Sequence, residues 1–126
     1  EYMAFAKIES VNSASIGRRI PLKFCYSDGV FLLLRISENK EFKDGKWLDT
    51  INGYTYECVD TMNFDKIRVK IDGQTKPLMT DEELQTRRES GEKVCIEFVD
   101  ATLMPYINSQ RVLTDSIKAT DVLLVE

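Results

Sequence analysis

The chain has 126 residues, of which 43% are hydrophobic and 30% charged, as is typical of one globular domain, and its net charge of −4 excludes a general polycation for nucleic acid. It contains no histidine, which excludes Ser-His-Asp triads, Cys-His dyads and histidine-ligated zinc. The longest apolar run, Val30 to Leu34, is far shorter than the roughly 18 to 20 residues of a membrane span, so we expect a soluble cytoplasmic protein.

The first 19 residues differ in sequence pattern from the rest of the chain. Glu1 and Tyr2 precede a methionine, so we interpret these two residues as a cloning remnant. Residues 10–17 are small and polar without hydrophobic periodicity. We therefore expect a flexible N-terminal arm over residues 1–19, available for self-association, and a folded domain over residues 20–126.

Two strand-like runs around an Asp-Gly pair predict a hairpin. Over residues 20–26, apolar side chains alternate with others as in a strand. Asp28-Gly29 favours a tight turn because both residues tolerate positive φ, and residues 30–36 supply the partner strand. The following residues, 38–50, mix charged and aromatic side chains without a period, so we expect a long exposed loop there.

The middle of the chain predicts two strands and a helix. Residues 53–59 and residues 66–72 both alternate with a period of two. The segment between them, residues 60–64, fits either a turn or a bulge in one long strand. Thr80 to Glu83 has the sequence of a capping box, which predicts the start of a helix of about ten residues ending near Gly91.

The C-terminal part predicts further strands. Residues 92–99 alternate again, residues 102–107 continue that strand beyond a kink at Pro105, and residues 117–125 form the last strand. Five principal strands with one helix between the third and the fourth are typical of the OB-fold. We therefore expect a mainly β protein, a five-stranded OB-fold-like Greek-key barrel with one short helix between strands 3 and 4. Other small mixed barrels and α+β sheets also fit this order.

The sequence offers no catalytic constellation. Cys25, Cys58 and Cys95 are far apart and lie in strand-like runs, so we interpret them as small buried hydrophobes rather than as disulfide or zinc ligands. No glycine-rich phosphate loop or nucleophile elbow occurs. We predict no enzyme activity, no metal and no cofactor.

A pattern of cations points to a binding function. Lys66, Arg68 and Lys70 alternate along one strand about 6 to 7 Å apart, which is close to the phosphate repeat of an extended single strand. The alternative is an ordinary solvated strand face. Tyr54 and Tyr56 share a face of the preceding strand, where they would either stack on bases or face the core.

Three more residues complete the candidate site. Trp47, the only tryptophan, would either stack on a base or cover the barrel mouth. Arg35 ends an apolar strand and would point into a groove, and Tyr106 is a weaker stacking candidate. The predicted nucleic-acid-binding residues are Tyr54, Tyr56, Lys66, Arg68, Lys70, Trp47, Arg35 and Tyr106.

Parts of the chain resemble a known group of proteins. The segments are Tyr54–Ile71 (YTYECVDTMNFDKIRVKI), Val94–Val99 and Lys118–Val122. They are similar to small accessory proteins of Gram-positive conjugative plasmids and integrative elements, namely OB-fold single-stranded-DNA-binding proteins and helicase-processivity factors. This resemblance implies sequence-independent binding of single-stranded DNA, oligomeric coating of the strand and no catalysis. By position, it assigns the contacts to Tyr54, Tyr56, Lys66 and Arg68.

The leading hypothesis is therefore a non-enzymatic protein that binds single-stranded DNA, with RNA as an alternative ligand and conjugation or replication proteins as partners. A second hypothesis is a protein-interaction barrel without DNA binding, such as a helicase or relaxase accessory factor or a phage adaptor. It follows from charge distribution, because residues 77–126 contain 5 basic and 10 acidic side chains and would suit a basic partner.

Overall fold

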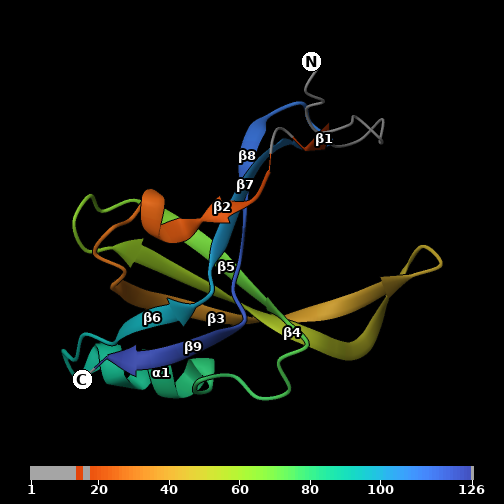
Figure 1. The fold of residues 1–126 in the computed structure, drawn as a ribbon. Helices are drawn as coiled ribbons and strands as arrows, with labels where there is room; N and C mark the ends of the chain where they lie inside the picture. Colours follow the sequence, from red (N-terminus) through yellow and green to blue (C-terminus); the bar gives the residue numbers. More distant parts are fainter. Residues whose placement is uncertain (1–13, 16–17, 126) are drawn as a thin grey trace.

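A computed structural model describes residues 14–15 and 18–125 of the chain and shows a mainly β protein with one α-helix in that part (Figure 1). None of the helices in these ranges has the length and apolar character that crossing a bilayer requires. The elements in chain order are β1 (Ala14–Ser15), β2 (Ile20–Pro21), the 3-10 helix η1 (Leu22–Phe24), β3 (Phe31–Lys43), β4 (Lys46–Asp60), β5 (Lys66–Asp72), α1 (Asp81–Glu89), β6 (Cys95–Val99), β7 (Thr102–Ile107), β8 (Leu113–Lys118) and β9 (Asp121–Val125).

All nine strands belong to one sheet, in the order β1-β7-β8-β5-β4-β3-β6-β9, with β2 also paired to β7. Neighbouring strands are antiparallel except β5 and β8, which meet in parallel at Lys70 and Lys118. The prediction of a mainly β fold is confirmed. The pairing path is open at both ends, so the described strands do not close into a barrel, and the predicted five-stranded OB-fold-like Greek-key barrel is not confirmed.

The core lies on one face of this sheet. In β5, Ile67, Val69 and Ile71 are buried and alternate with exposed residues, as predicted for this segment. The strand predicted over residues 53–59 is also confirmed, and a turn rather than a bulge joins it to β5. Because one face of β5 is apolar and the other charged, its register fixes which side chains of β4 are buried.

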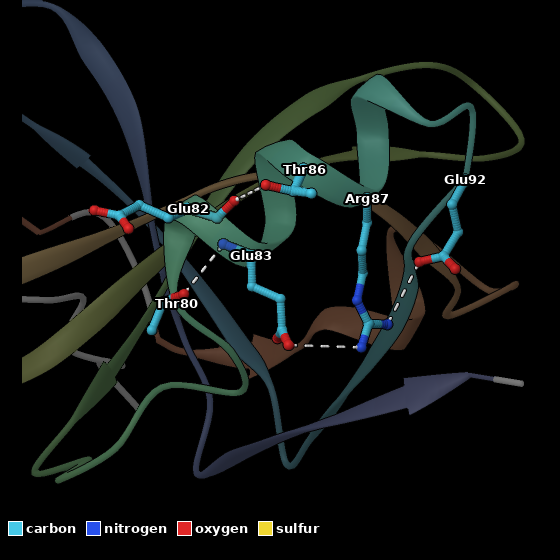
Figure 2. A network of polar contacts seen from close by, with 6 residues as sticks. All are labelled: Thr80, Glu82, Glu83, Thr86, Arg87 and Glu92. Carbon is cyan, nitrogen blue, oxygen red and sulfur yellow. Dashed lines mark hydrogen bonds and ion pairs between the residues drawn. The ribbon is translucent and has the colours of Figure 1, made fainter.

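Helix α1 begins where the capping box predicts. The Thr80 hydroxyl accepts a hydrogen bond from the Glu83 amide at 3.1 Å (Figure 2). Arg87 lies near its other end, where its guanidinium reaches the carboxylates of Glu83 at 3.9 Å and Glu92 at 3.4 Å. Gly91 follows with φ of 91°, which ends the helix as predicted.

The predicted first hairpin is wrong. Residues 20–26 form β2 and η1 instead of one strand, and the Leu22 carbonyl accepts hydrogen bonds from the amides of Cys25 and Tyr26. Of the alternating apolar residues at 20, 22, 24 and 26, Leu22 alone is buried. A turn does occur at Gly29, whose φ is 71°, but it joins η1 to β3, while β2 pairs with β7.

The predicted loop over residues 38–50 is also wrong. β3 and β4 continue through it as a two-stranded projection, which Figure 1 shows reaching away from the body of the sheet, and we call residues 38–52 the β3–β4 extension. Its turn is Asp44-Gly45, with φ of 54° and 75°, as a type I′ turn requires. The sequence lacks an apolar period here because Phe42 and Trp47 remain exposed.

Two bends divide the C-terminal strands. The segment predicted as residues 92–107 bends between β6 and β7 at Asp100, whose φ is 50°, and not at Pro105, which pairs with Asp115 inside β7. The last predicted strand is likewise divided into β8 and β9 by Ala119 and Thr120. β6 pairs with β9, and β7 pairs with β8. The two pairs are therefore two parts of one bent hairpin.

The described part of residues 1–19 lies against the sheet. β1 pairs with β7 at Ile107 and Tyr106, and the rest of the predicted flexible arm, residues 1–13 and 16–17, lies outside the described residues. The Arg19 guanidinium donates hydrogen bonds to the side chain and carbonyl of Thr102 and to those of Ser116, at 2.8 to 3.3 Å. Arg19 thus joins the start of the domain to β7 and β8.

We expect Arg19→Ala to lower the free energy of unfolding by about 1 to 2 kcal/mol, because the mutation removes charge-assisted hydrogen bonds to two strands. Urea denaturation of the purified protein measures this change. Arg18→Ala is the matched control, since Arg18 is exposed, and it should change the free energy by less than about 0.5 kcal/mol. Equal effects of the two substitutions would contradict the role assigned to Arg19.

Candidate nucleic-acid interface

The predicted row of cations on β5 is exposed. Lys66, Arg68 and Lys70 point away from the core, and the side chain of Arg68 is 75% exposed. Strand alternation holds these side chains on one face, because the residues between them are buried. The prediction that these three cations share one face of the strand is confirmed, and that face is exposed.

Neighbouring strands extend the row sideways. Across β4, Arg35 of β3 and Arg68 of β5 both pair with Glu57, so they share one face of the sheet. On the other side, Lys70 pairs with Lys118 of β8. We call this surface the cationic face, and its cations are Arg35, Lys66, Arg68, Lys70 and Lys118.

Two carboxylates lie among these cations. Glu57, whose side chain is mostly buried, contacts Lys66 Nζ at 3.2 Å and Arg68 at 4.0 Å. Asp72 contacts Lys118 Nζ at 3.5 Å. Within the described ranges, Arg35 and Lys70 have no ion-pair partner within 4.0 Å. The face therefore keeps a surplus of positive charge although the whole chain is acidic.

The predicted stacking role of Tyr54 and Tyr56 is not compatible with their positions. Tyr54 pairs with Ile71 and Tyr56 with Val69, so both tyrosines lie on the core face, opposite the cations. Tyr54 is 9% and Tyr56 0% exposed. The structure thus corrects the hypothesis that Tyr54 and Tyr56 stack on bases. It supports the alternative, in which both side chains face the core.

The Tyr56 hydroxyl is used inside the protein. It donates a hydrogen bond to Gln74 Oε1 at 2.8 Å and accepts one from the Leu78 amide at 2.9 Å. Burial raises the pKa of Tyr56 above the ordinary value for tyrosine. Tyr56 therefore fastens the segment between β5 and α1 to the core.

The exposed aromatic candidates lie elsewhere. Trp47 is 71% exposed on the β3–β4 extension and packs against Phe42 of the opposite strand, with ring centroids 4.8 Å apart. Tyr106 is half-buried in β7. Alternation places it on the same face of β7 as Thr102, which pairs with Lys118. Trp47 thus covers no barrel mouth, and Tyr106 lies on the side of the sheet that carries the cations.

Sequence reasoning missed Lys118 as a member of this surface. Lys118 is brought beside Lys70 by the parallel pair of β5 and β8, whose partners are far apart in the chain. No local pattern around Lys118 signals this contact. Arg19 also crosses this side of β7 and β8, where its guanidinium donates hydrogen bonds to Thr102 and Ser116.

The cysteines differ in their surroundings. Cys58 is buried, and burial together with the carboxylates of Asp60 and Glu57 raises the pKa of its thiol to about 12, so it stays protonated. Cys25 is exposed, which corrects the expectation that all three cysteines are buried. Among the described residues, no group of three or more Cys, Asp or Glu side chains is arranged to hold a metal ion.

Comparisons of the chain with protein-family models, with curated proteins and with solved structures gave no match. The features that bear on a function are therefore the geometry and charge of the cationic face and the exposed rings of Trp47 and Phe42 on the β3–β4 extension.

Proposed function

We propose that this protein binds single-stranded nucleic acid, DNA in the first place, without sequence preference and without catalysis. The observation that carries this proposal is the cationic face, where side chains from β3, β5 and β8 converge and Arg35 and Lys70 have no carboxylate partner within the described ranges. Cations spaced along a strand suit the phosphates of an extended chain, and such contacts carry no base specificity.

The strand order supports the same proposal. If the two-residue strands β1 and β2 are left out and β6 with β7 and β8 with β9 are each counted as one bent strand, five strands remain, with α1 between the third and the fourth. That is the order of the OB-fold, and we propose that the sheet is an opened variant of it. OB-folds bind oligonucleotides across their second and third strands, which correspond to β4 and β5 here.

Single strands are favoured over duplex because the protein offers aromatic ring surface as well as cations. Trp47 and Phe42 on the β3–β4 extension and Tyr106 on β7 offer ring surface to unpaired bases, whereas bases in a duplex are already stacked. An accessory role in conjugative transfer or mobile-element replication fits this activity, and it is supported by the sequence resemblance.

Fluorescence anisotropy of a labelled dT30 oligonucleotide tests the proposed function. We expect saturable binding that weakens markedly between about 50 and 200 mM salt, since bound phosphates release counterions. Unlabelled single strands should compete and duplex DNA should not, and single-stranded RNA as a competitor measures the preference between DNA and RNA. Absence of binding at tens of micromolar protein in low salt would overturn the proposal and favour a protein-interaction role.

We expect Trp47→Ala to weaken binding of dT30 by about 10-fold, because one base stacked on an aromatic ring contributes about 1 to 3 kcal/mol. The same experiment on Phe24→Ala is the matched control, since Phe24 is 72% exposed on η1 and no part of the proposed site. The fluorescence of Trp47, the only tryptophan, should be quenched as dT30 is added to the unmodified protein. Unquenched Trp47 with full binding would remove the β3–β4 extension from the interface.

A further inference from the structure

A second candidate site is a cavity whose lining includes Leu22 and Lys23 of η1. In Figure 1, η1 lies on the opposite side of the strands from α1. The cavity is open and has a volume of about 360 Å³, within the range of about 300 to 1,000 Å³ that is usual for ligand sites. Its apolar wall contains the rings of Tyr26, Phe31 and Phe98. The Tyr26 and Phe31 centroids are 5.8 Å apart, and those of Phe31 and Phe98 are 5.7 Å apart.

Carboxylates lie in and beside the lining of this cavity. Asp100 lines the cavity, and Asp28 is the sequence neighbour of the lining residue Gly29. The hydroxyl of Tyr26, another lining residue, donates a hydrogen bond to Asp65 Oδ2 at 3.3 Å. Among the described lining residues, Lys23 is the single cation. Burial and the nearby carboxylates, Asp65 foremost, raise the pKa of Tyr26 to about 12. Asp100 and Asp65 thus place two carboxylates in or beside the lining against the one cation, Lys23.

Aromatic rings and carboxylates together favour a cation with an apolar stem. A guanidinium stacks on aromatic faces and pairs with carboxylates through several N–H groups, while its three methylenes pack on the apolar wall. We propose that this cavity binds an arginine side chain that a protein partner presents. None of the five cations of the cationic face lines this cavity, so the proposal does not depend on nucleic-acid binding.

Titration of the whole chain with the tripeptide acetyl-Gly-Arg-Gly-amide tests this site. Two-dimensional ¹H–¹⁵N NMR spectra of the protein measure the binding. We expect saturable shifts of the amides of Gly29, Asp100 and Ala101, with a dissociation constant on the order of 1 mM. The same peptide with citrulline in place of arginine is a neutral isostere and should bind at least about 5-fold more weakly. Equal binding of the two peptides, shifts centred elsewhere or no saturable shift would overturn the proposal.

Substitutions of the two charged lining residues test whether charge contributes to binding of the arginine peptide. Asp100→Asn should weaken the arginine peptide several-fold, and Lys23→Gln should strengthen its binding, because the first removes an attractive charge and the second a repulsive one. Asp49→Asn on the β3–β4 extension is the control and should leave the affinity unchanged. All three residues are exposed, so the fold should persist, and an unchanged affinity in both lining variants would contradict an arginine site.

Discussion

Replacing Arg68 and Lys70 together by glutamate is expected to weaken binding of single-stranded DNA by at least about 100-fold. Each of these side chains is placed to donate a charge-assisted contact to a phosphate, and such contacts contribute about 1.5 to 3 kcal/mol apiece. Both side chains are exposed on the cationic face, so the substitution should leave the fold intact. Anisotropy with dT30 measures the affinity, and circular dichroism checks the fold.

The matched control for this experiment is Lys76→Glu with Lys93→Glu. Both lysines are exposed and lie outside the cationic face, and the pair changes the net charge by the same amount. If the control weakens binding as much as the double substitution on β5, then long-range charge and not a localised face would explain the affinity. Retained binding in the β5 variant would contradict the proposed interface.

Tyr56→Ala is expected to lower the free energy of unfolding by about 4 kcal/mol, since it leaves a cavity where a fully buried ring packs. Tyr56→Phe keeps the ring and should cost about 1 to 2 kcal/mol, because the Leu78 amide and Gln74 lose their hydrogen-bond partner. Both values come from denaturant titrations at constant pH.

DNA binding by Tyr56→Phe tests whether the Tyr56 hydroxyl takes part in the interface. A core position predicts that the folded variant binds dT30 with the affinity of the unmodified protein, because the hydroxyl never reaches the surface. A loss of affinity without a loss of stability would contradict the core position. The exposed Trp47 should behave in the opposite way, with a large effect on binding and a small one on stability.

The alternation of β4 and β5 was predictable, but the side of β4 that faces the core was not. Residues 53–59 alternate between tyrosine, tyrosine and cysteine on one face and threonine and glutamate on the other. A period of two defines two faces without saying which one another layer covers. The pairing with β5 decides this, because Val69 and Ile71 bring Tyr56 and Tyr54 to the core side.

The β3–β4 extension escaped sequence reasoning for a different physical reason. Hydrophobic periodicity appears only where one face of a strand is buried, and both faces of the extension are exposed to solvent over much of its length. The usable signal was local, an Asp44-Gly45 pair flanked by lysines with Phe42 and Trp47 across from each other. Helix α1, by contrast, was predictable because its cap is encoded within four residues, Thr80 to Glu83.

The long-range pairing of β5 with β8 and of β3 with β6 also determines how the chain reaches this structure. The β3–β4–β5 meander can form from neighbouring residues, but its two free edges need strands that occur only after α1. Such non-local pairing slows folding toward the millisecond-to-second range. During synthesis on the ribosome, the apolar side of the meander emerges before β6 and β8 exist to border it. A nascent chain of this protein therefore exposes an aggregation-prone sheet, with apolar surface and unpaired strand edges, until its last strands are made.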